Sequence, residues 1–462
     1  MRPSFRRCLS ILALAVLPTA CGGGGGGGLF GGGGGGCGAV LALGMNAAEP
    51  DEVVLQLRPG QELEPVRVAN NLTLIAQFGA RPIFRLRVNG ADTVDAAVAR
   101  LQADTTRVMF AEPNLQGQSP ESRRCSVWSI GEPSVYTSQW APDALRLDGA
   151  QALSQGTGVR VAVLDTGIDL VHPVFTGRLL PGYDFVDDDA TPAESGDRND
   201  AGFGHGTHVA GLVLLAAPQA QIMPLRVLDQ MGQGNAWVLA EALAWAVDPD
   251  GDPATDDGAH VVNFSLGTLR QTKLLEIAVR IASCDLDDDD GENDLADTRF
   301  DDDRGRCAGR RGAVVFAAAG NSGSGSEVLY PAAEASLVPI LGARSVTAST
   351  EARRLASFAN FGSWVQIASP GEGITSTVPG GGYGVWSGTS MASPLAAGVA
   401  ALVMAGGTGP DPQVYTGLRS WAPEDLALRL GNRTAALCGT TPLRQIDAQA
   451  AVTDTPAPDP AC

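Results

Sequence analysis

The stretch Gly388-Thr-Ser-Met-Ala-Ser-Pro394 runs directly into an almost wholly apolar, alanine-rich segment from Leu395 to Met404. Such a segment predicts a helix that is buried on most of its sides. Ser390 would then stand at the N-terminus of that helix, where unpaired backbone N–H groups and the helix dipole favour negative charge. A serine nucleophile needs this setting, because acyl transfer develops an oxyanion beside it. Taken alone, the stretch is more simply read as a helix cap, since Ser and Thr are preferred caps.

Two upstream segments favour the catalytic interpretation. Asp165 directly follows the β-rich run Val159–Leu164, so we expect it at the carboxyl end of a buried strand, where open α/β sheets build their sites. His205 lies in Gly204-His-Gly-Thr-His-Val-Ala-Gly211, in the first turn of an apolar helix.

Aspartic proteases also use Asp-Thr-Gly, but they need two carboxylates and this chain has one copy of the motif. A zinc site at His205 and His208 lacks the glutamate of the HExxH pattern and an evident third ligand, so His208 is predicted to be structural.

The order Asp, His, Ser, with the serine in a Gly-Thr-Ser turn, is the chain order of subtilisin. The three blocks resemble the signature blocks of the subtilisin-like serine proteases, and the similarity extends over roughly residues 140–452. The resemblance implies Ser390 as nucleophile, His205 as general base and then acid, and Asp165 as the residue that orients the histidine. It also implies a doubly wound α/β fold, with a mostly parallel sheet and helices on both faces. Leu395 replaces the usual histidine of the family, at a helix position outside the triad.

Two further blocks match the family pattern. Asn321 follows an apolar run and a glycine, and the resemblance implies that its side-chain N–H donates to the oxyanion beside the backbone N–H of Ser390. The stretch His260-Val-Val-Asn-Phe-Ser-Leu-Gly267 resembles a strand whose backbone pairs with the extended substrate. The implied walls of the specificity pocket are Ser265, Leu266, Gly267, Ala318, Ala319 and Gly320. Tyr330-Pro-Ala332 resembles a family turn in which the proline is often cis.

A small domain is predicted before the catalytic region. Strands are expected at 52–57, 72–78, 83–88 and 107–110, with a helix at 93–103 that Thr93 caps. This βαββαβ pattern indicates a ferredoxin-like α+β domain. Its position and its end at Ala111-Glu-Pro-Asn114 resemble the inhibitory propeptide of subtilisin-like proteases, with a small independent binding module as the alternative. The expected organisation is a signal peptide (1–20), a Gly-rich tether (21–49), a propeptide-like domain (50–118), a linker (119–137), the catalytic domain (138–453) and a tail (454–462).

The N-terminus predicts export. Three arginines precede the apolar run from Leu9 to Leu17, which is too short to serve as a permanent membrane span. The junction Ala20-Cys21 resembles a bacterial lipoprotein signal, in which Cys21 carries the lipid, although Pro18 replaces the usual leucine. Ordinary signal cleavage therefore stays open. The nearly pure glycine stretch Gly22–Gly36 predicts a flexible tether. The expected location is the bacterial cell envelope or cell surface, with secretion as the alternative.

The charge pattern excludes one class of partner and suggests a metal. Lys plus Arg number 32 and Asp plus Glu 51, so the net charge of −19 argues against nucleic acid as a partner. Carboxylates in a Gly/Pro turn suit calcium, with a solvated acidic turn as the alternative; the candidate ligands are Asp248, Asp250, Asp252, Asp256 and Asp257. The denser stretch Asp285–Asp303 fits an EF-hand loop only in part, because Leu286 occupies the first ligand position. The resemblance implies no cofactor for catalysis.

In an exported protein the cysteines are expected to form disulfides, although sequence does not determine their connectivity. The first expected pair is Cys284 with Cys307, which bracket the acidic insert, and the second is Cys438 with Cys462.

The function that these motifs predict is an exported serine endopeptidase that works through an acyl-enzyme. Its expected partners are polypeptide substrates, its own propeptide and, through a lipid anchor, the membrane. Two alternatives stay open: a catalytically silent surface-binding protein that kept the fold, and a processing protease dedicated to one partner protein.

Overall fold

The structure is a computed structural model and describes residues 47–120, 132–252, 255–284, 312–334, 342–406, 421–439 and 441–462. The predicted signal peptide, Cys21 and most of the tether lie outside these residues. The same holds for Cys307 and for the stretch that partly fits an EF-hand loop.

A nine-stranded sheet forms the centre of the larger domain. Its strands are, in spatial order, β15 (Thr434–Ala436), β16 (Arg444–Ile446), β12 (Ile367–Pro370), β11 (Ala343–Ser349), β10 (Val314–Ala318), β9 (Val261–Phe264), β5 (Arg160–Asp165), β7 (Gln221–Arg226) and β6 (Tyr183–Asp184). Every neighbouring pair is parallel except β15 with β16. The central strands are apolar on both faces, as a covered parallel sheet requires.

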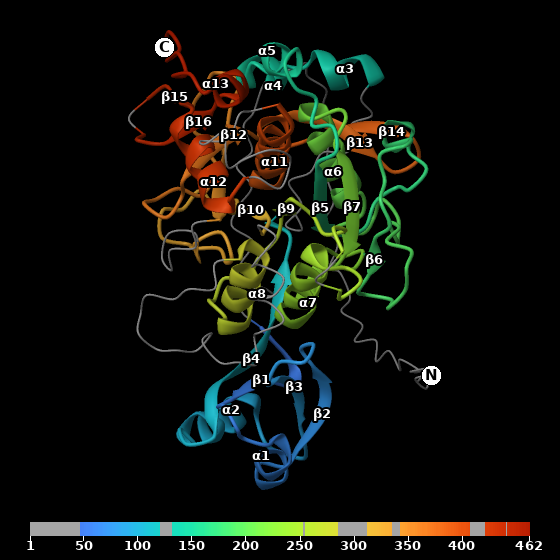
Figure 1. Cartoon of the computed structure of the whole chain (residues 1–462), viewed down its shortest axis with the longest axis vertical. Coiled ribbons are helices and arrows are strands. Elements are labelled where there is room, and N and C mark those ends of the chain that lie inside the picture. The colour runs from blue at the N-terminus through green and yellow to red at the C-terminus, as the bar shows by residue number, and fades with distance from the viewer. Residues whose placement is uncertain are drawn as a thin grey trace, which may run out of the picture. The chain divides into compact units, whose positions relative to one another are not determined.

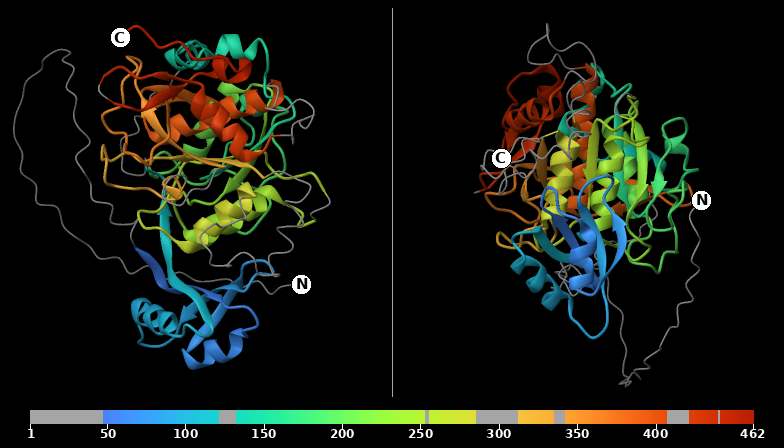
Figure 2. Two further views of the ribbon diagram at one scale, coloured as in Figure 1. Left: turned by 60° about the vertical axis from the view of Figure 1, so that its left-hand side comes forward. Right: turned by 60° about the horizontal axis from the view of Figure 1, so that its bottom comes forward.

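Helices cover both faces of this sheet (Figures 1 and 2). Val161 and Val163 of β5 belong to the core cluster that also contains α6 (His205–Ala216) and α11 (Thr389–Gly406). The alternate residues of β5 belong to a second cluster with α7 (Ala236–Val247) and α8 (Lys273–Ser283). The predicted doubly wound α/β fold is therefore confirmed. Shorter elements complete the domain: α3 (Pro133–Ser138), α4 (Trp140–Leu145), α5 (Leu147–Gln151), β8 (Gln233–Asn235), β13 (Ile374–Val378), β14 (Gly382–Trp386), α12 (Pro423–Asn432) and α13 (Ala448–Thr453).

The strand order reverses at β5. This strand lies between β7 on one side and β9 on the other, so the chain first builds the sheet in one direction and later in the opposite direction. In open α/β sheets, ligands bind outside the carboxyl ends of the strands at such a switch point. Asp165 closes β5 and Ser265 directly follows β9.

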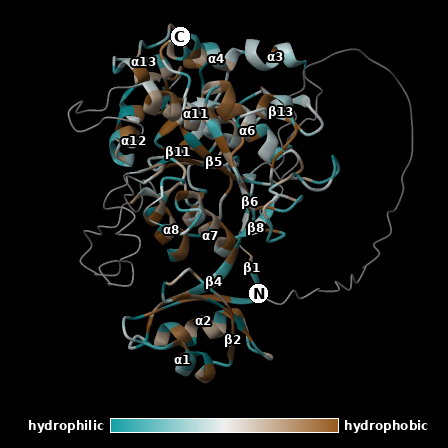
Figure 3. Cartoon of the chain, turned by 45° about the vertical axis from the view of Figure 1, so that its right-hand side comes forward, coloured by the Kyte–Doolittle hydropathy of each residue, from teal (hydrophilic) through white to brown (hydrophobic). Residues whose placement is uncertain are grey.

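Helix α11 is the central helix of the domain. By length and composition it is apolar enough to cross a membrane, but 89% of it is buried inside the protein. Figure 3 shows apolar residues concentrated on α11, α7 and the central strands, with hydrophilic residues along the outer loops. Ser390 lies in the first turn of this buried helix, as the sequence predicts.

The smaller domain precedes the sheet in the chain. Its elements are β1 (Ala48–Leu57), α1 (Leu63–Ala69), β2 (Leu72–Gln77), β3 (Ile83–Val88), α2 (Val94–Ala103) and β4 (Val108–Gln118). The four strands pair antiparallel in the order β2-β3-β1-β4 and enclose a core of their own. The ferredoxin-like prediction is confirmed, including the cap that Thr93 provides to the backbone N–H of Ala96. Strand β4 is longer than predicted and continues to Gln118.

Three local expectations can be compared with the structure. Cys438 and Cys462 form the predicted disulfide across a separation of 24 residues. The Tyr330–Pro331 peptide bond is cis, as the family resemblance implies. Helix α3 begins at Pro133, within the segment predicted as a linker, because proline suits the first position of a helix, where its missing N–H needs no partner.

The α6–α11 contact provides a stability test. A Cβ atom added at Gly398 of α11 would lie 2.5 Å from the Cβ of Ala216 and 2.8 Å from the carbonyl oxygen of Val213. We expect Gly398→Ala to force the helices apart and to lower the free energy of unfolding by about 1–3 kcal/mol. Gly431 of α12 is the matched control, because nothing lies within 4 Å of an added Cβ. There, alanine should be neutral or stabilising by up to ~1 kcal/mol. Equal denaturation midpoints for the two variants would contradict the packing argument.

Candidate active site

Asp165 and His205 form a buried pair. Asp165 ends β5, His205 opens α6, and Nδ1 of His205 lies 2.6 Å from Oδ1 of Asp165. Both side chains are only 1% exposed. The backbone N–H of Thr166 also donates to Oδ1 of Asp165, at 2.8 Å. Because a carboxylate accepts only, Nδ1 of His205 carries the proton and Nε2 is the basic nitrogen.

His208 forms its hydrogen bond with a residue outside this pair. Its Nε2 lies 3.2 Å from the carbonyl oxygen of Gly384, and its ring stacks on Trp386 at a centroid distance of 4.9 Å. Burial lowers the pKa of His208 to about 3, so the ring stays neutral and its Nε2–H donates to the carbonyl. The two histidines thus have different hydrogen-bond partners, although the ring of Trp386 also lies 5.8 Å from that of His205.

Ser390 lies at the N-terminus of α11 and contacts the strand end that carries Ser265. Its Oγ donates to the carbonyl oxygen of Ser265 at 3.2 Å, and Oγ of Ser265 donates back to the carbonyl oxygen of Ser390 at 3.2 Å. The second contact has a local cause. Pro394 lies four residues after Ser390 and has no N–H for the helical bond to this carbonyl, so the Ser265 hydroxyl supplies the missing donor.

Asn321 is oriented by Thr389. The backbone N–H and the hydroxyl of Thr389 both donate to Oδ1 of Asn321, each at 2.9 Å. The Thr389 hydroxyl oxygen also accepts from the backbone N–H of Gly320 at 3.0 Å. Because two donors point at Oδ1 of Asn321, this atom is the amide oxygen and not the amide nitrogen. Nδ2 of Asn321, a hydrogen-bond donor, is consequently the end of the amide turned away from Thr389.

A segment of the chain itself lies along the expected substrate strand. Gln118 and Gly267 exchange two backbone hydrogen bonds, of 3.0 and 3.1 Å, in an antiparallel bridge. On the other side, Gln116–Gln118 at the end of β4 pair antiparallel with β8, and Ser119 donates to the carbonyl oxygen of Gly232 at 3.1 Å. The end of β4 therefore fills a channel between β8 and the segment that follows β9.

The two predicted pocket walls lie at the ends of the neighbouring parallel strands β9 and β10. Ala319 and then Gly320 follow the last residue of β10, and Nδ2 of Asn360 donates to the carbonyl oxygen of Ala319 at 3.0 Å. A small cavity is lined by Pro120 together with Gly320, Asn321 and Leu329. Pro120 follows the paired segment by two residues, so the chain passes from the channel directly to the Asn321 side of the site.

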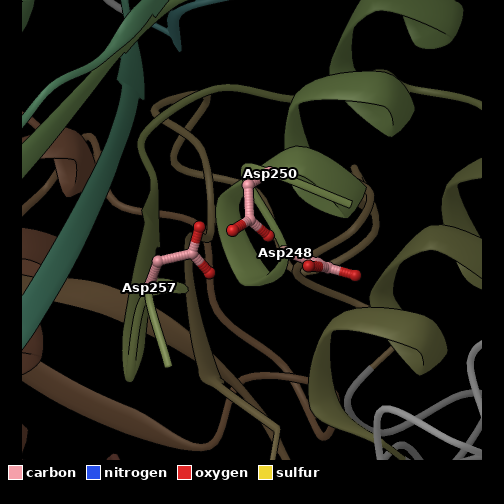
Figure 4. Close-up of side chains that lie close together, drawn as sticks. All are labelled: Asp248, Asp250 and Asp257. Carbon is pink, nitrogen blue, oxygen red and sulfur yellow. The ribbon is translucent and has the colours of Figure 1, made fainter. Parts of the chain in front are cut away.

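Three of the five predicted calcium ligands come together. Asp248, Asp250 and Asp257 each offer a carboxylate oxygen, and these oxygens lie within 4.8 Å of one another (Figure 4). Asp256 instead forms an ion pair with Arg160. Asp252 does not belong to the group of three. The cluster lies between α7 and β9, and its carboxylates are partly or fully exposed.

Sequence reasoning missed two parts of the site. Strand β8 forms one wall of the channel, and the only signal for it is a short Gly-rich stretch before the cap of α7. The carboxylate of Glu194 accepts from the backbone N–H groups of Gly204 and Thr207 at the start of α6, each at 3.1 Å. It stands in a polar, acidic loop without periodicity, so no sequence pattern distinguishes it from its neighbours.

A family profile described as "Subtilase family" matches residues 156–427, which is more than half of the chain. The chain belongs to the subtilase family. It is 32% identical to the thermophilic serine proteinase of Bacillus sp. strain AK1 over 374 residues, which cover 77% of this chain and 78% of that relative. It is also 32% identical to thermitase of Thermoactinomyces vulgaris, over 61% of this chain and 87% of the relative. This subtilase is accordingly a serine endopeptidase.

The solved structure of fervidolysin from Fervidobacterium pennivorans shares the fold of this subtilase. The TM-score is 0.64 at 23% identity, over 89% of this chain and 62% of that structure. Fervidolysin is described as a keratinolytic enzyme related to subtilisin, and at this identity the similarity concerns the fold alone.

Proposed function

We propose that this subtilase is an exported endopeptidase that cleaves peptide bonds through an acyl-enzyme formed on Ser390. The main support for this proposal is the buried 2.6 Å contact between His205 Nδ1 and Asp165 Oδ1. These residues lie on α6 and β5, whose ends meet at the switch point of the sheet. With Nδ1 committed to the carboxylate, Nε2 takes the proton of Ser390 as general base and later gives it to the leaving amine. Asp165 keeps the tautomer and stabilises the imidazolium.

The oxyanion would be held by two donors. The backbone N–H of Ser390 lies at the N-terminus of α11, where the helix dipole favours negative charge. Nδ2 of Asn321 is the second donor, in the orientation that Thr389 imposes on the amide. Donors that are already oriented stabilise the developing charge without reorganisation during the reaction. This arrangement favours a working enzyme over a catalytically silent binding protein.

The substrate would bind as the end of β4 now does. In an antiparallel pairing with Ser265–Gly267, an extended peptide gains backbone hydrogen bonds on one side, and β8 offers a second edge. Such backbone contacts recognise polypeptides in general. Specificity would come from the pocket between Ser265–Gly267 and Ala318–Gly320. A dedicated processing role for one partner protein would need selectivity beyond these backbone contacts.

We infer that the domain from residue 50 to 118 is an inhibitory propeptide. Besides filling the channel, β4 caps the two helices on the far face of the sheet. Glu112 accepts from the N–H groups of Lys273 and Leu274 at the start of α8, at 2.9 and 3.1 Å. Asn114 accepts from the N–H of Trp237 at the start of α7, at 3.1 Å. These helix caps anchor the domain outside the site, while the same strand blocks it.

Export and lipid attachment at Cys21 are proposed from the sequence of the N-terminus. Mass spectrometry of the N-terminal peptide of the purified protein separates the outcomes, because a diacylated Cys21 and an unmodified signal-cleaved terminus differ in mass.

We expect Asn321→Ala to lower kcat by about 10²–10³-fold with little change in KM, the loss known for one such donor in subtilisin. The physical reason is that the donor acts on charge that develops only in the transition state. Hydrolysis of a peptide anilide by the processed enzyme measures both constants. Ser322→Ala, which changes the next residue along the chain, serves as the control. A kcat equal to wild type in Asn321→Ala would remove Asn321 from the mechanism.

Calcium at the Asp248–Asp250–Asp257 group should stabilise the native state by mass action, by about 2.7 kcal/mol at a calcium concentration of 100 times Kd. We expect a chelator to lower Tm, and calcium rather than magnesium to restore it. Asp257→Asn should abolish this difference, and Asp252→Asn, outside the group of three, should keep it. Identical melting curves of wild type with and without the chelator would refute the calcium proposal.

Self-processing gives the most direct test of the nucleophile. Antiparallel register with Gln118 opposite Gly267 brings Pro120 beside Ser265, whose carbonyl accepts from Ser390 Oγ. The bond after Pro120 is therefore the one that we expect to be cut. Ser390→Ala should accumulate as the uncut precursor and fail to react with a fluorophosphonate probe, whereas wild type should react and yield a chain beginning at Glu121. Intact-mass measurement in a host without other proteases decides this. Trimming of Ser390→Ala at the same bond would refute self-processing.

A further inference from the structure

Glu194 connects the two elements that carry Asp165 and His205. Its carboxylate lies in the loop between β6 and α6 and accepts hydrogen bonds from four donors. Two are the backbone N–H groups of Gly204 and Thr207 in the first turn of α6, each at 3.1 Å. The others are the hydroxyl of Thr207 at 3.0 Å and the hydroxyl of Thr166, the residue after Asp165, at 3.2 Å. One side chain thus holds the start of the histidine helix and the turn after the aspartate strand.

The two threonine hydroxyls extend this connection. Each threonine hydroxyl has one proton and donates it in a hydrogen bond to Glu194. Each hydroxyl oxygen can therefore only accept hydrogen bonds from its other neighbours. Thr166 Oγ1 accepts from the backbone N–H of Gly206 at 3.0 Å, and Thr207 Oγ1 accepts from the backbone N–H of Asp169 at 2.9 Å. The carboxylate therefore sets the direction of two further hydrogen bonds that cross between α6 and the turn after β5.

These two elements are already in close contact near Asp165. A Cβ atom added at Gly206 would lie 2.1 Å from the carbonyl oxygen of Gly167 and 3.0 Å from Cβ of Asp165. The first turn of α6 thus rests directly on the turn after β5. Small displacements of either element would change the geometry of the 2.6 Å contact between His205 and Asp165.

Retaining a carboxylate here has an energetic cost. Burial raises the pKa of Glu194 to about 8, the nearby charge of Asp165 acts in the same direction, and the backbone donors of Gly204 and Thr207 oppose the shift. Among the described residues, no lysine or arginine forms an ion pair with Glu194. Strongly perturbed carboxyl groups at a site are often kept for function rather than for stability.

We propose that Glu194 is a positioning residue of the Asp165–His205 pair, clamping the first turn of α6 to the turn after β5. The proposal rests on the proposed roles of Asp165, His205 and Ser390. Glu194 touches neither substrate nor the reacting atoms, and it acts through the relative placement of the aspartate and the histidine. A misplacement of about 1 Å in such a pair can reduce the rate ~10²-fold.

The alternative is that Glu194 is only a helix cap. The control for that role is Asp447, a buried carboxylate that accepts from the N–H of Ala450 at the start of α13, at 2.8 Å, and that also forms an ion pair with Arg146 at 3.2 Å. Asp447 belongs to an element outside the site. Removal of either carboxylate should lower stability through the lost cap, by about 0.5–2 kcal/mol. Only the removal of Glu194 should affect the reaction.

The experiment compares Glu194→Gln with Asp447→Asn in the processed enzyme. We expect Glu194→Gln to lower kcat by about 10–100-fold with KM within ~2-fold of wild type, and Asp447→Asn to leave both constants unchanged. A proton NMR spectrum should also show the low-field resonance of the His205 Nδ1–H shifted or broadened in Glu194→Gln alone. An unchanged kcat and an unchanged resonance in Glu194→Gln, with Tm lowered as in Asp447→Asn, would overturn the proposal in favour of a simple cap.

Thr166→Val supplies a second route to the same answer if Glu194→Gln fails to fold. It removes one of the two hydroxyls through which the clamp acts, so it should lower kcat in the same way. The double variant should lose little more than either single variant, because both changes break one network. Independent, additive losses would refute the clamp. Failure of the proposed function is distinguishable, because Ser390→Ala would then retain activity equal to wild type.

Discussion

The close packing of α11 against α6 is the contact on which the site depends. Gly398 lets the two helices approach so far that an added methyl group would collide with Ala216 and the backbone of Val213. Both helices lie on one face of the sheet. Helix α6 begins at His205, and α11 begins one residue before Ser390. Bringing the helices together therefore brings two helix N-termini, and with them the proposed base and the proposed nucleophile, to the same end of the sheet. The positive ends of both dipoles then favour the negative charge of an acyl-transfer intermediate.

Three helix N-termini in this molecule receive a side chain from another segment of the chain. Glu194 serves α6, Glu112 serves α8 and Asn114 serves α7. Burial raises the pKa of Glu112 to about 7 and that of Glu194 to about 8, so each carboxylate is held against a desolvation cost that the backbone N–H donors reduce. The same chemistry serves two purposes: in one case it links elements of the site, and in the other it attaches the smaller domain.

The sequence predicts the parts of this structure that depend on short-range patterns. The apolar run after Ser390 has helical length and no polar face, the run before Asp165 has strand composition, and both elements form as expected. The βαββαβ order of the smaller domain was also predictable, whereas the Cys438–Cys462 disulfide was an expectation that forms although sequence does not determine connectivity. Contacts that depend on tertiary placement were not. Glu194 sits in an irregular loop, and its partners Thr166 and Thr207 are 28 and 13 residues away in sequence. Nothing local shows that they meet.

The end of β4 occupies the channel in the uncut chain, at the place where a substrate is proposed to bind. A strand that pairs with Gly267 and β8 in the uncut chain uses the backbone contacts proposed for substrate, so cleavage alone does not remove it. Its attachment has a second part, however, because Glu112 and Asn114 bind helix ends away from the channel. If the smaller domain is the proposed inhibitory propeptide, a segment held at both places would stay bound after its covalent link is cut, since the remote anchor keeps its effective concentration at the channel high. A short peptide substrate lacks that anchor and leaves readily. On this proposal the difference between inhibitor and substrate would lie outside the channel, in two polar side chains that cap helices of the catalytic domain.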